Sequence, residues 1–196
     1  DYGDLASYAS EVNDKIHYTL SQFDVYAIAS NPSIGRLSGY ARHHKFTYNQ
    51  EYNLTAYSIN QDAYSIGGLW NKNIGQLHIR ASAELALLGQ RLGDFIQGEL
   101  SQQLNKNTIL NAGIRWQQQH PGLVFERYNS SYRDYQWDRP AELEQRLSIH
   151  GEISHKLLGT LRVTMNNIKN YAYYMQPNAD TFTIVPMQHS KALSLL

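Results

Sequence analysis

The chain has 196 residues, enough for one domain with a sizeable sheet, and its 17 Lys and Arg residues balance its 17 Asp and Glu residues. This neutrality argues against a nucleic-acid-binding protein, which normally carries a basic excess. The chain has no cysteine, which excludes disulfides and thiol metal sites, and no apolar run approaches the roughly 18 residues of a transmembrane helix.

Extended structure with a period of two fills the first part of the chain. The predicted strands there cover 16–29, 37–48, 52–60 and 64–70. Residues 31–35 have the chemistry of a turn, and the polar pair at 61–62 is expected to separate the last two strands. The two faces of the strand over 37–48 are less clearly separated than those of later strands.

Three cleaner strands follow, bounded by short Asn-Lys-Asn turns at 71–73 and 105–107 and by a loop near 91. In the first of them, apolar residues at odd positions from Leu77 alternate with polar residues at even positions. The other two cover about 95–101 and 110–117. One face of each strand is aliphatic, and the other carries charges that a packed interior rarely accepts.

Residues 118–142 interrupt this rhythm with a Pro-Gly pair and a polar aromatic run, and we expect them to form a long extracellular loop. The clearest hairpin of the chain follows between 144 and 170. Its aliphatic face consists of Leu147, Ile149, Gly151 and Ile153, then Leu161, Val163 and Met165 after the turn. Residues 171–175 are predicted to continue the second strand of this hairpin, and after a loop at 176–180 extended structure is predicted at 181–185 and 188–196.

Strand length is the strongest argument for a membrane barrel. The predicted strands have about ten residues, as a tilted strand of about 9–11 residues needs to cross a bilayer, whereas soluble strands average about 5–6. Short turns are predicted near 50, 72, 106 and 158, and longer loops near 33, 62, 91, 118–142 and 176–180. Short connections at one end and longer ones at the other are typical of outer-membrane barrels. We therefore expect residues 1–196 to form a single β-barrel domain or a fragment of one.

In a barrel the charged face lines the lumen. The predicted pore-lining residues are His78, Arg80, Glu84, Glu99, Arg115, Arg146, His150, Glu152 and Arg162. Their mixed signs predict a pore without strong ion preference, because rings of one sign are what select ions. Aromatic residues near the predicted strand ends are candidates for the membrane interface, although cross-strand aromatic pairing explains them equally well. These are Tyr64, Trp70, Trp116, Tyr171 and Tyr173.

The sequence shows no pattern of a catalytic or metal site. It lacks a nucleophile elbow, a zinc-binding helix motif and a phosphate-binding glycine loop. His43 and His44 are adjacent, so in a strand they point to opposite faces and cannot share one metal ion. We expect no enzyme activity, no metal and no cofactor.

Two stretches resemble a known family. The first is Phe125-Glu126-Arg127-Tyr128-Asn129-Ser130-Ser131-Tyr132-Arg133-Asp134-Tyr135-Gln136-Trp137, and the second is Asn170-Tyr171-Ala172-Tyr173-Tyr174 with the later Pro186-Met187-Gln188. Over about residues 105–196 the chain resembles the putative porins of Bacteroidota, and before that more weakly. The resemblance implies part of an outer-membrane β-barrel. Family members are much longer than this chain, which has no secretory signal at its start and stops in what looks like an unfinished strand at 192–196. We therefore expect a fragment of a longer chain.

The sequence thus predicts an all-β protein, an antiparallel transmembrane β-barrel that is part of a larger up-and-down barrel in a bacterial outer membrane. Passive diffusion of small solutes through its lumen is the expected function. The expected partners are outer-membrane lipid and, through the 118–142 loop, other envelope proteins, but not nucleic acid. The alternative is a structural or partner-binding β-barrel subunit of an outer-membrane complex. A soluble sandwich or lipid-binding barrel, and lastly an outer-membrane hydrolase, stay open.

Overall fold

The computed structural model describes residues 15–52, 55–89, 93–128, 137–138, 141–175, 185–189 and 192–195. Its main strands are β1 (Lys15–Asn31), β2 (Gly35–Tyr52), β3 (Thr55–Ile74), β4 (Leu77–Leu88), β5 (Asp94–Asn105), β6 (Thr108–Gln119), β9 (Glu144–His155), β10 (Gly159–Lys169) and β13 (Ala192–Leu195). The smaller elements are the helix α2 (Leu123–Glu126) and the strands β7 (Arg127–Tyr128), β8 (Trp137–Asp138), β11 (Tyr171–Met175) and β12 (Val185–His189).

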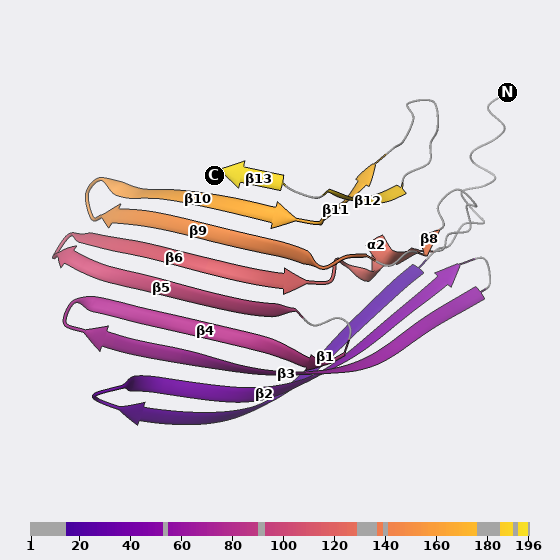
Figure 1. Cartoon of the computed structure of the whole chain (residues 1–196), viewed down its shortest axis with the longest axis horizontal. Coiled ribbons are helices and arrows are strands. Elements are labelled where there is room, and N and C mark those ends of the chain that lie inside the picture. Colours follow the sequence, from indigo (N-terminus) through magenta and orange to yellow (C-terminus); the bar gives the residue numbers. More distant parts are fainter. Residues whose placement is uncertain are drawn as a thin grey trace.

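The main strands form one antiparallel nine-stranded sheet in the order β1-β2-β3-β4-β5-β6-β9-β10-β13. Figure 1 shows it as a single curved layer of long hairpins. The predicted all-β, antiparallel class is confirmed. Within the described residues the sheet is open, because β1 pairs only with β2 and β13 only with β10.

Four hairpin turns of two or three residues lie together at one end of the sheet, on the left in Figure 1. They occupy 32–34, 75–76, 106–107 and 156–158. The short turns predicted near 106 and 158 are therefore confirmed. The turn predicted at 71–73 is wrong in position, because these residues still belong to β3 and pair with β4, and the chain turns at 75–76. The connection near 33 was predicted as a longer loop, but it is another member of this short-turn end. The turn predicted near 50 belongs to the opposite end, where β2 stops at Tyr52.

Strand pairing assigns every side chain of the sheet to one of two faces, because successive side chains point to opposite sides. We call the face that carries Asp24, Arg42, Ser65 and Glu84 the inner face and the other the outer face. The outer face of the half of the sheet nearest the short turns is covered by exposed aliphatic and aromatic side chains, which we call the apolar belt. The belt includes Phe23, Val25, Leu37, Ile66, Leu85, Ile96, Leu100, Leu110, Ile114, Ile149, Ile153, Leu161 and Val163.

The three longest strands change the side on which they carry apolar residues. In β1, Ile16, Tyr18 and Leu20 lie on the inner face, whereas Phe23 and Val25 lie on the outer face. The pairing of β1 with β2 continues through this change without a bulge. The apolar residues therefore change face only because the sequence pattern shifts by one residue.

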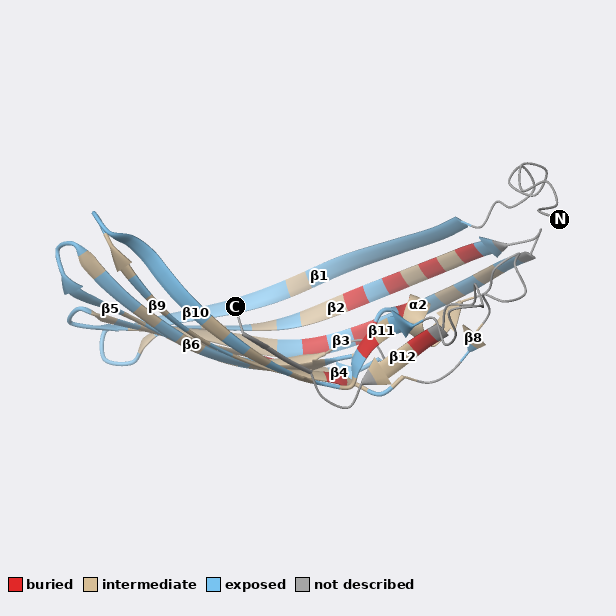
Figure 2. Ribbon diagram, turned by 90° about the horizontal axis from the view of Figure 1, so that it is seen from above, coloured by how far each residue is buried: buried red, intermediate tan, exposed pale blue. Residues whose placement is uncertain are grey.

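The same reversal occurs in β2 and β3. Phe46 and Tyr48 are buried on the inner face, while Lys45 is exposed on the outer face. Figure 2 shows this as alternating buried and less buried residues along β2, toward the end away from the short turns. We call residues 15–21, 44–52 and 55–63 the extension. It is apolar inside and polar outside, the opposite of the rest of the sheet, which explains why the faces over 37–48 looked poorly separated.

The predicted division of 52–60 and 64–70 into two strands is wrong, because β3 runs unbroken from Thr55 to Ile74. Gln61 and Asp62 lie within it, opposite Phe46 and Lys45. Asp62 points to the polar outer face of the extension, where its Oδ1 lies 2.8 Å from Nε2 of His43. A polar pair without Gly or Pro does not break a strand whose outer face is wet.

Candidate functional site

The inner face brings together all of the predicted pore-lining residues. Their strand partners follow one another across the sheet: Arg80 pairs with Glu99, Glu99 with Gly113, and Gly113 with His150. The other six fall on the same side by the same pairing, and are His78, Glu84, Arg115, Arg146, Glu152 and Arg162. That they line a pore stays a prediction.

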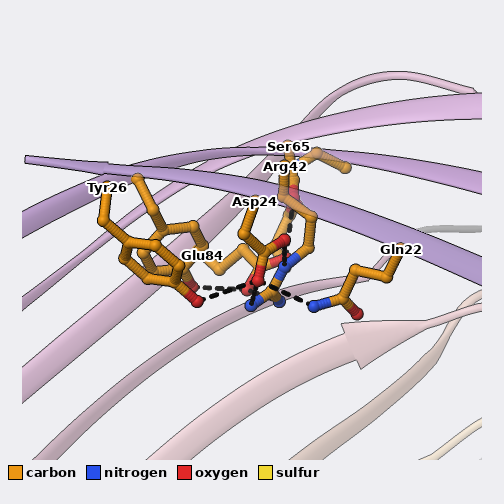
Figure 3. A network of polar contacts seen from close by, with 9 residues as sticks. Gln22, Asp24, Tyr26, Arg42, Ser65 and Glu84 are labelled. Atoms are coloured by element: carbon orange, nitrogen blue, oxygen red, sulfur yellow. Dashed lines mark hydrogen bonds and ion pairs between the residues drawn. The ribbon is translucent and has the colours of Figure 1, made fainter.

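A charge network crosses the first four strands on this face (Figure 3). Arg42 donates from Nε to Oδ1 of Asp24 and from Nη1 to Oε2 of Glu84, both at 2.8 Å. The side chains are 20%, 14% and 8% exposed for Arg42, Asp24 and Glu84, so all three are largely withdrawn from solvent. One guanidinium therefore holds two carboxylates from strands that are not neighbours. We call these three residues the Arg42 network.

Neutral side chains complete the hydrogen bonding of both carboxylates. Tyr40 donates its hydroxyl to Oε2 of Glu84 at 2.5 Å, and Ser65 donates to Oε1 at 2.7 Å. On the other side, Tyr26 and Gln22 each donate to Oδ2 of Asp24 at 2.8 Å. A charge withdrawn from water is tolerated when its hydrogen bonds are satisfied in this way.

Gly67 leaves the space that the network needs. It is the β3 residue opposite both Tyr40 on β2 and Glu84 on β4. A Cβ atom at Gly67 would lie 2.3 Å from the hydroxyl oxygen and ring of Tyr40. The Tyr40 ring can therefore lie across β3 and reach Glu84 only because residue 67 has no side chain.

Of these residues only Glu84 was predicted from the sequence, whereas Asp24, Tyr40 and Arg42 were not. Their signal was the unbroken alternation of β1 and β2, which places residues 24, 40 and 42 on the charged face. The shift of the apolar pattern after Leu20 concealed it in β1. Because β1 is unbroken, its even-numbered residues all lie on one face, and this places Asp24 on the inner face.

The remaining charges of the inner face are held to different degrees. Glu152 accepts from Nε of Arg162 at 2.6 Å and from Asn111 at 3.0 Å. Nη2 of Arg146 lies 3.3 Å from Oε1 of Glu144, and Arg115 donates to the amide oxygens of Gln117 and Gln97. Arg80 and Glu99 face each other in the pairing, but neither forms an ion pair within the described part of the chain.

The predicted interface aromatics fall into two groups. Tyr64, Trp70 and Trp116 lie on the outer face. Tyr64 is not near a strand end as predicted, because β3 continues past it, but it lies where the apolar belt meets the extension. Tyr171 and Tyr173 lie on β11, which pairs with β12 in a separate small sheet. The prediction that 171–175 continue the second strand of the hairpin is therefore wrong, because β10 ends at Lys169 and the backbone bends at Asn170, whose φ is 56°. Their membrane role stays a prediction.

The long connection after β6 packs against the inner face of the extension. Residues 120–124 and the inner-face residues Ile16, Tyr18, Phe46 and Tyr48 form the walls of one groove of about 330 Å³. The guanidinium of Arg127 donates to the hydroxyl of Tyr57 on β3 and lies 5.1 Å from the centre of its ring. The hydrogen bond from Arg127 to Asp138 raises the pKa of Arg127, so this cation is permanent. Part of the predicted 118–142 loop therefore lies against the sheet, and its extracellular position stays a prediction.

The two stretches that carry the family resemblance contact each other. Phe125 stacks on Tyr174 with ring centres 4.5 Å apart. The ring centres of Trp137 and Tyr174 are 5.9 Å apart. Burial raises the pKa of the Tyr174 hydroxyl. Gln188 donates to the backbone oxygens of Glu142 and Asn170, which ties β12 to the start of β9. The other tyrosines of the first stretch, Tyr132 and Tyr135, lie outside the described residues.

Comparison of the sequence with protein families shows the family of this chain. A family model described as "Putative porin" matches residues 3–196. The chain belongs to this family. The match extends the resemblance from about 105–196 to nearly the whole sequence, and it supports a porin-like protein. It says nothing of the taxon, so Bacteroidota stays a prediction. No curated protein and no solved structure matches the chain.

Two further observations concern alternative classes of protein. No helix in the described ranges has the length and apolar character needed to cross a membrane. No three His, Asp or Glu side chains come together as metal ligands within those ranges.

Replacing Arg42 with Met should destabilise the sheet, because Asp24 and Glu84 would keep their charges without the guanidinium. We expect a loss of about 2 kcal/mol, the order found when one member of a largely buried pair is removed. The thermal midpoint of the purified protein in detergent, followed by circular dichroism, measures it. Arg115→Met is the control, since Arg115 is held by neutral amides. The triple variant Asp24→Asn, Arg42→Met, Glu84→Gln should regain most of the loss, and failure to do so would contradict this account.

Replacing Arg127 with Leu should loosen the long connection from the extension. The variant removes the hydrogen bond and ring contact to Tyr57 and the ion pair to Asp138. We expect faster backbone hydrogen exchange in residues 120–128, while exchange in β9 and β10 stays unchanged. Lys156→Leu, in a short turn at the other end of the sheet, is the control. Equal protection of 120–128 in wild type and Arg127→Leu would show that other contacts hold the segment.

Proposed function

We propose that the chain forms part of a closed transmembrane β-barrel in a bacterial outer membrane, and that small polar solutes diffuse passively through its lumen. Membership of the porin family supports the general class. The observation that carries the proposal is the apolar belt on the outer face together with the charged inner face. In a barrel these would meet lipid and water, respectively.

The length of the belt approaches a bilayer span. It covers about seven residues on β9 and about nine on β4, which correspond to roughly 20–27 Å along a strand. A tilted strand needs about 9–11 residues to cross the hydrocarbon core, so the belt on β4 reaches this span and the belt on β9 is slightly shorter. A soluble protein rarely exposes a continuous apolar area of this extent. The soluble sandwich is therefore the less favoured alternative.

The extension indicates which end of the proposed barrel is extracellular. Its outer face carries exposed Lys45, Ser58 and Asp62 in place of aliphatic side chains, as a segment outside the bilayer requires. Outer-membrane barrels have short periplasmic turns and longer extracellular loops. The four short turns would then be periplasmic, and the extension and the 118–142 connection would be extracellular.

Closure follows from the same environment. Unpaired backbone groups are too costly in lipid, so in the proposed barrel the edges of β1 and β13 are also paired, either with each other or with further strands. The function requires no chemistry, cofactor or metal, and the proposed partner is outer-membrane lipid. Contact with other envelope proteins through the 118–142 connection is the second proposal for this surface.

The belt can be tested with two arginine substitutions on the outer face of β3. Ile66→Arg places a charge in the belt, and Ser58→Arg places it in the extension, eight residues away on the same face. We expect Ile66→Arg to cost about 2–4 kcal/mol of folding free energy in lipid vesicles and Ser58→Arg about 0–1 kcal/mol. Urea titration of the vesicle-folded protein measures both. Equal costs would contradict the proposed membrane position.

The function can be tested by single-channel recording on the intact parent protein, reconstituted into a planar bilayer. Stable open steps support a diffusion pore. Insertion without conductance would contradict it and favour the structural or partner-binding subunit. A preparation that stays monodisperse without detergent would contradict the membrane barrel itself.

A further inference from the structure

A polar cavity of about 610 Å³ opens at the short-turn end of the inner face. Its walls come from the β1–β2 turn, the start of β2, the end of β3 and the start of β4. Arg36, Asn71, Asn73, His78 and Arg80 contribute its polar inner-face side chains. Among the described residues that line it, none is a carboxylate.

The two arginines of this cavity flank one amide. Asn71 on β3 is the direct partner of Arg36 on β2 and of Arg80 on β4. With neighbouring strands about 4.8 Å apart, the Cα atoms of the two arginines lie roughly 10 Å apart on the same face. Two long cationic side chains and an amide can therefore converge on one small group.

These arginines differ from the others of the inner face. Arg42, Arg146 and Arg162 each lie within ion-pair distance of a carboxylate, and Arg115 donates to two amide oxygens. In the described part of the chain, neither the Arg36 side chain nor the Arg80 side chain makes a hydrogen bond or an ion pair. Glu99 pairs with Arg80 through the backbone, but its carboxylate does not line the cavity and forms no ion pair with Arg80. Among the described residues, these two arginines therefore lack both a carboxylate partner and an amide partner, and both lie at the short-turn end of the inner face.

The geometry points to an anion-binding subsite in this cavity, formed by Arg36, Arg80 and Asn71, for small solutes that carry a carboxylate or phosphate group. A guanidinium presents a planar pair of N–H donors that matches such oxyanions, and the amide adds a neutral donor. The inference rests on the proposed function, because it assigns a solute class to the proposed lumen. It also replaces the expectation of no ion preference, which treated all inner-face charges as equivalent.

Block of the single-channel current by inorganic phosphate tests the subsite. In the intact parent protein we expect phosphate to reduce the open current, and the half-blocking concentration to rise about ten-fold in the double variant Arg36→Gln, Arg80→Gln. Such a change corresponds to the loss of one charge-assisted hydrogen bond. The double variant Lys15→Gln, Lys45→Gln, at two positions on the outer face of the extension, removes the same number of positive charges and should leave the block unchanged.

The possible failures are distinguishable. Open channels with the same phosphate block in wild type and double variant would overturn the subsite and leave the pore standing. If the protein inserts without conducting, the pore fails, and phosphate binding is measured by calorimetry in detergent. Binding that weakens about ten-fold in the double variant supports the subsite. Binding that is absent, or equal in both proteins, overturns it.

Discussion

Continuous backbone pairing along β1, β2 and β3 is the constraint on which the rest of the structure depends. Because the register of β1 against β2 is unbroken, each residue's face is decided by its parity alone. A one-residue shift in the apolar pattern after Leu20 therefore moves the apolar surface from the inner to the outer face. The belt, the extension and the groove beneath the long connection all follow from that shift.

The Arg42 network lies close to this reversal. On one side of it the inner face is apolar and buried by the long connection, and on the other it is polar and wet. A guanidinium between Asp24 and Glu84 ties β1, β2 and β4 together across β3 at this junction. Within the network one guanidinium compensates one of the two carboxylates, so these three residues together contribute a net charge of −1 to the proposed lumen. The two inner-face arginines that lack a side-chain partner within the described ranges, Arg36 and Arg80, lie near the short turns.

The long connection gives the family resemblance a structural meaning. Neither of the two stretches that carry the resemblance matches a known ligand-binding or catalytic motif. Phe125 and Trp137 from the first stretch pack on Tyr174 from the second, and Arg127 joins the first to Tyr57 on the inner face. These aromatic contacts hold a covering over the extension. In a barrel such a covering would narrow one mouth, while the cavity of Arg36 and Arg80 occupies the other.

The sequence by itself determined the all-β class, the two-faced strands and the common face of residues as distant as His78 and Arg162, because alternation is a local property of an extended backbone. Only the tertiary structure decided that β3 runs through Gln61 and Asp62, since a polar pair interrupts a strand or continues it according to what its outer face meets. The same holds for the joining of Arg42 to Glu84, which requires a specific register and the empty space over Gly67. No local pattern encodes a contact between strands that are not neighbours, and so the compensated charges could be separated from the free ones only in the folded sheet.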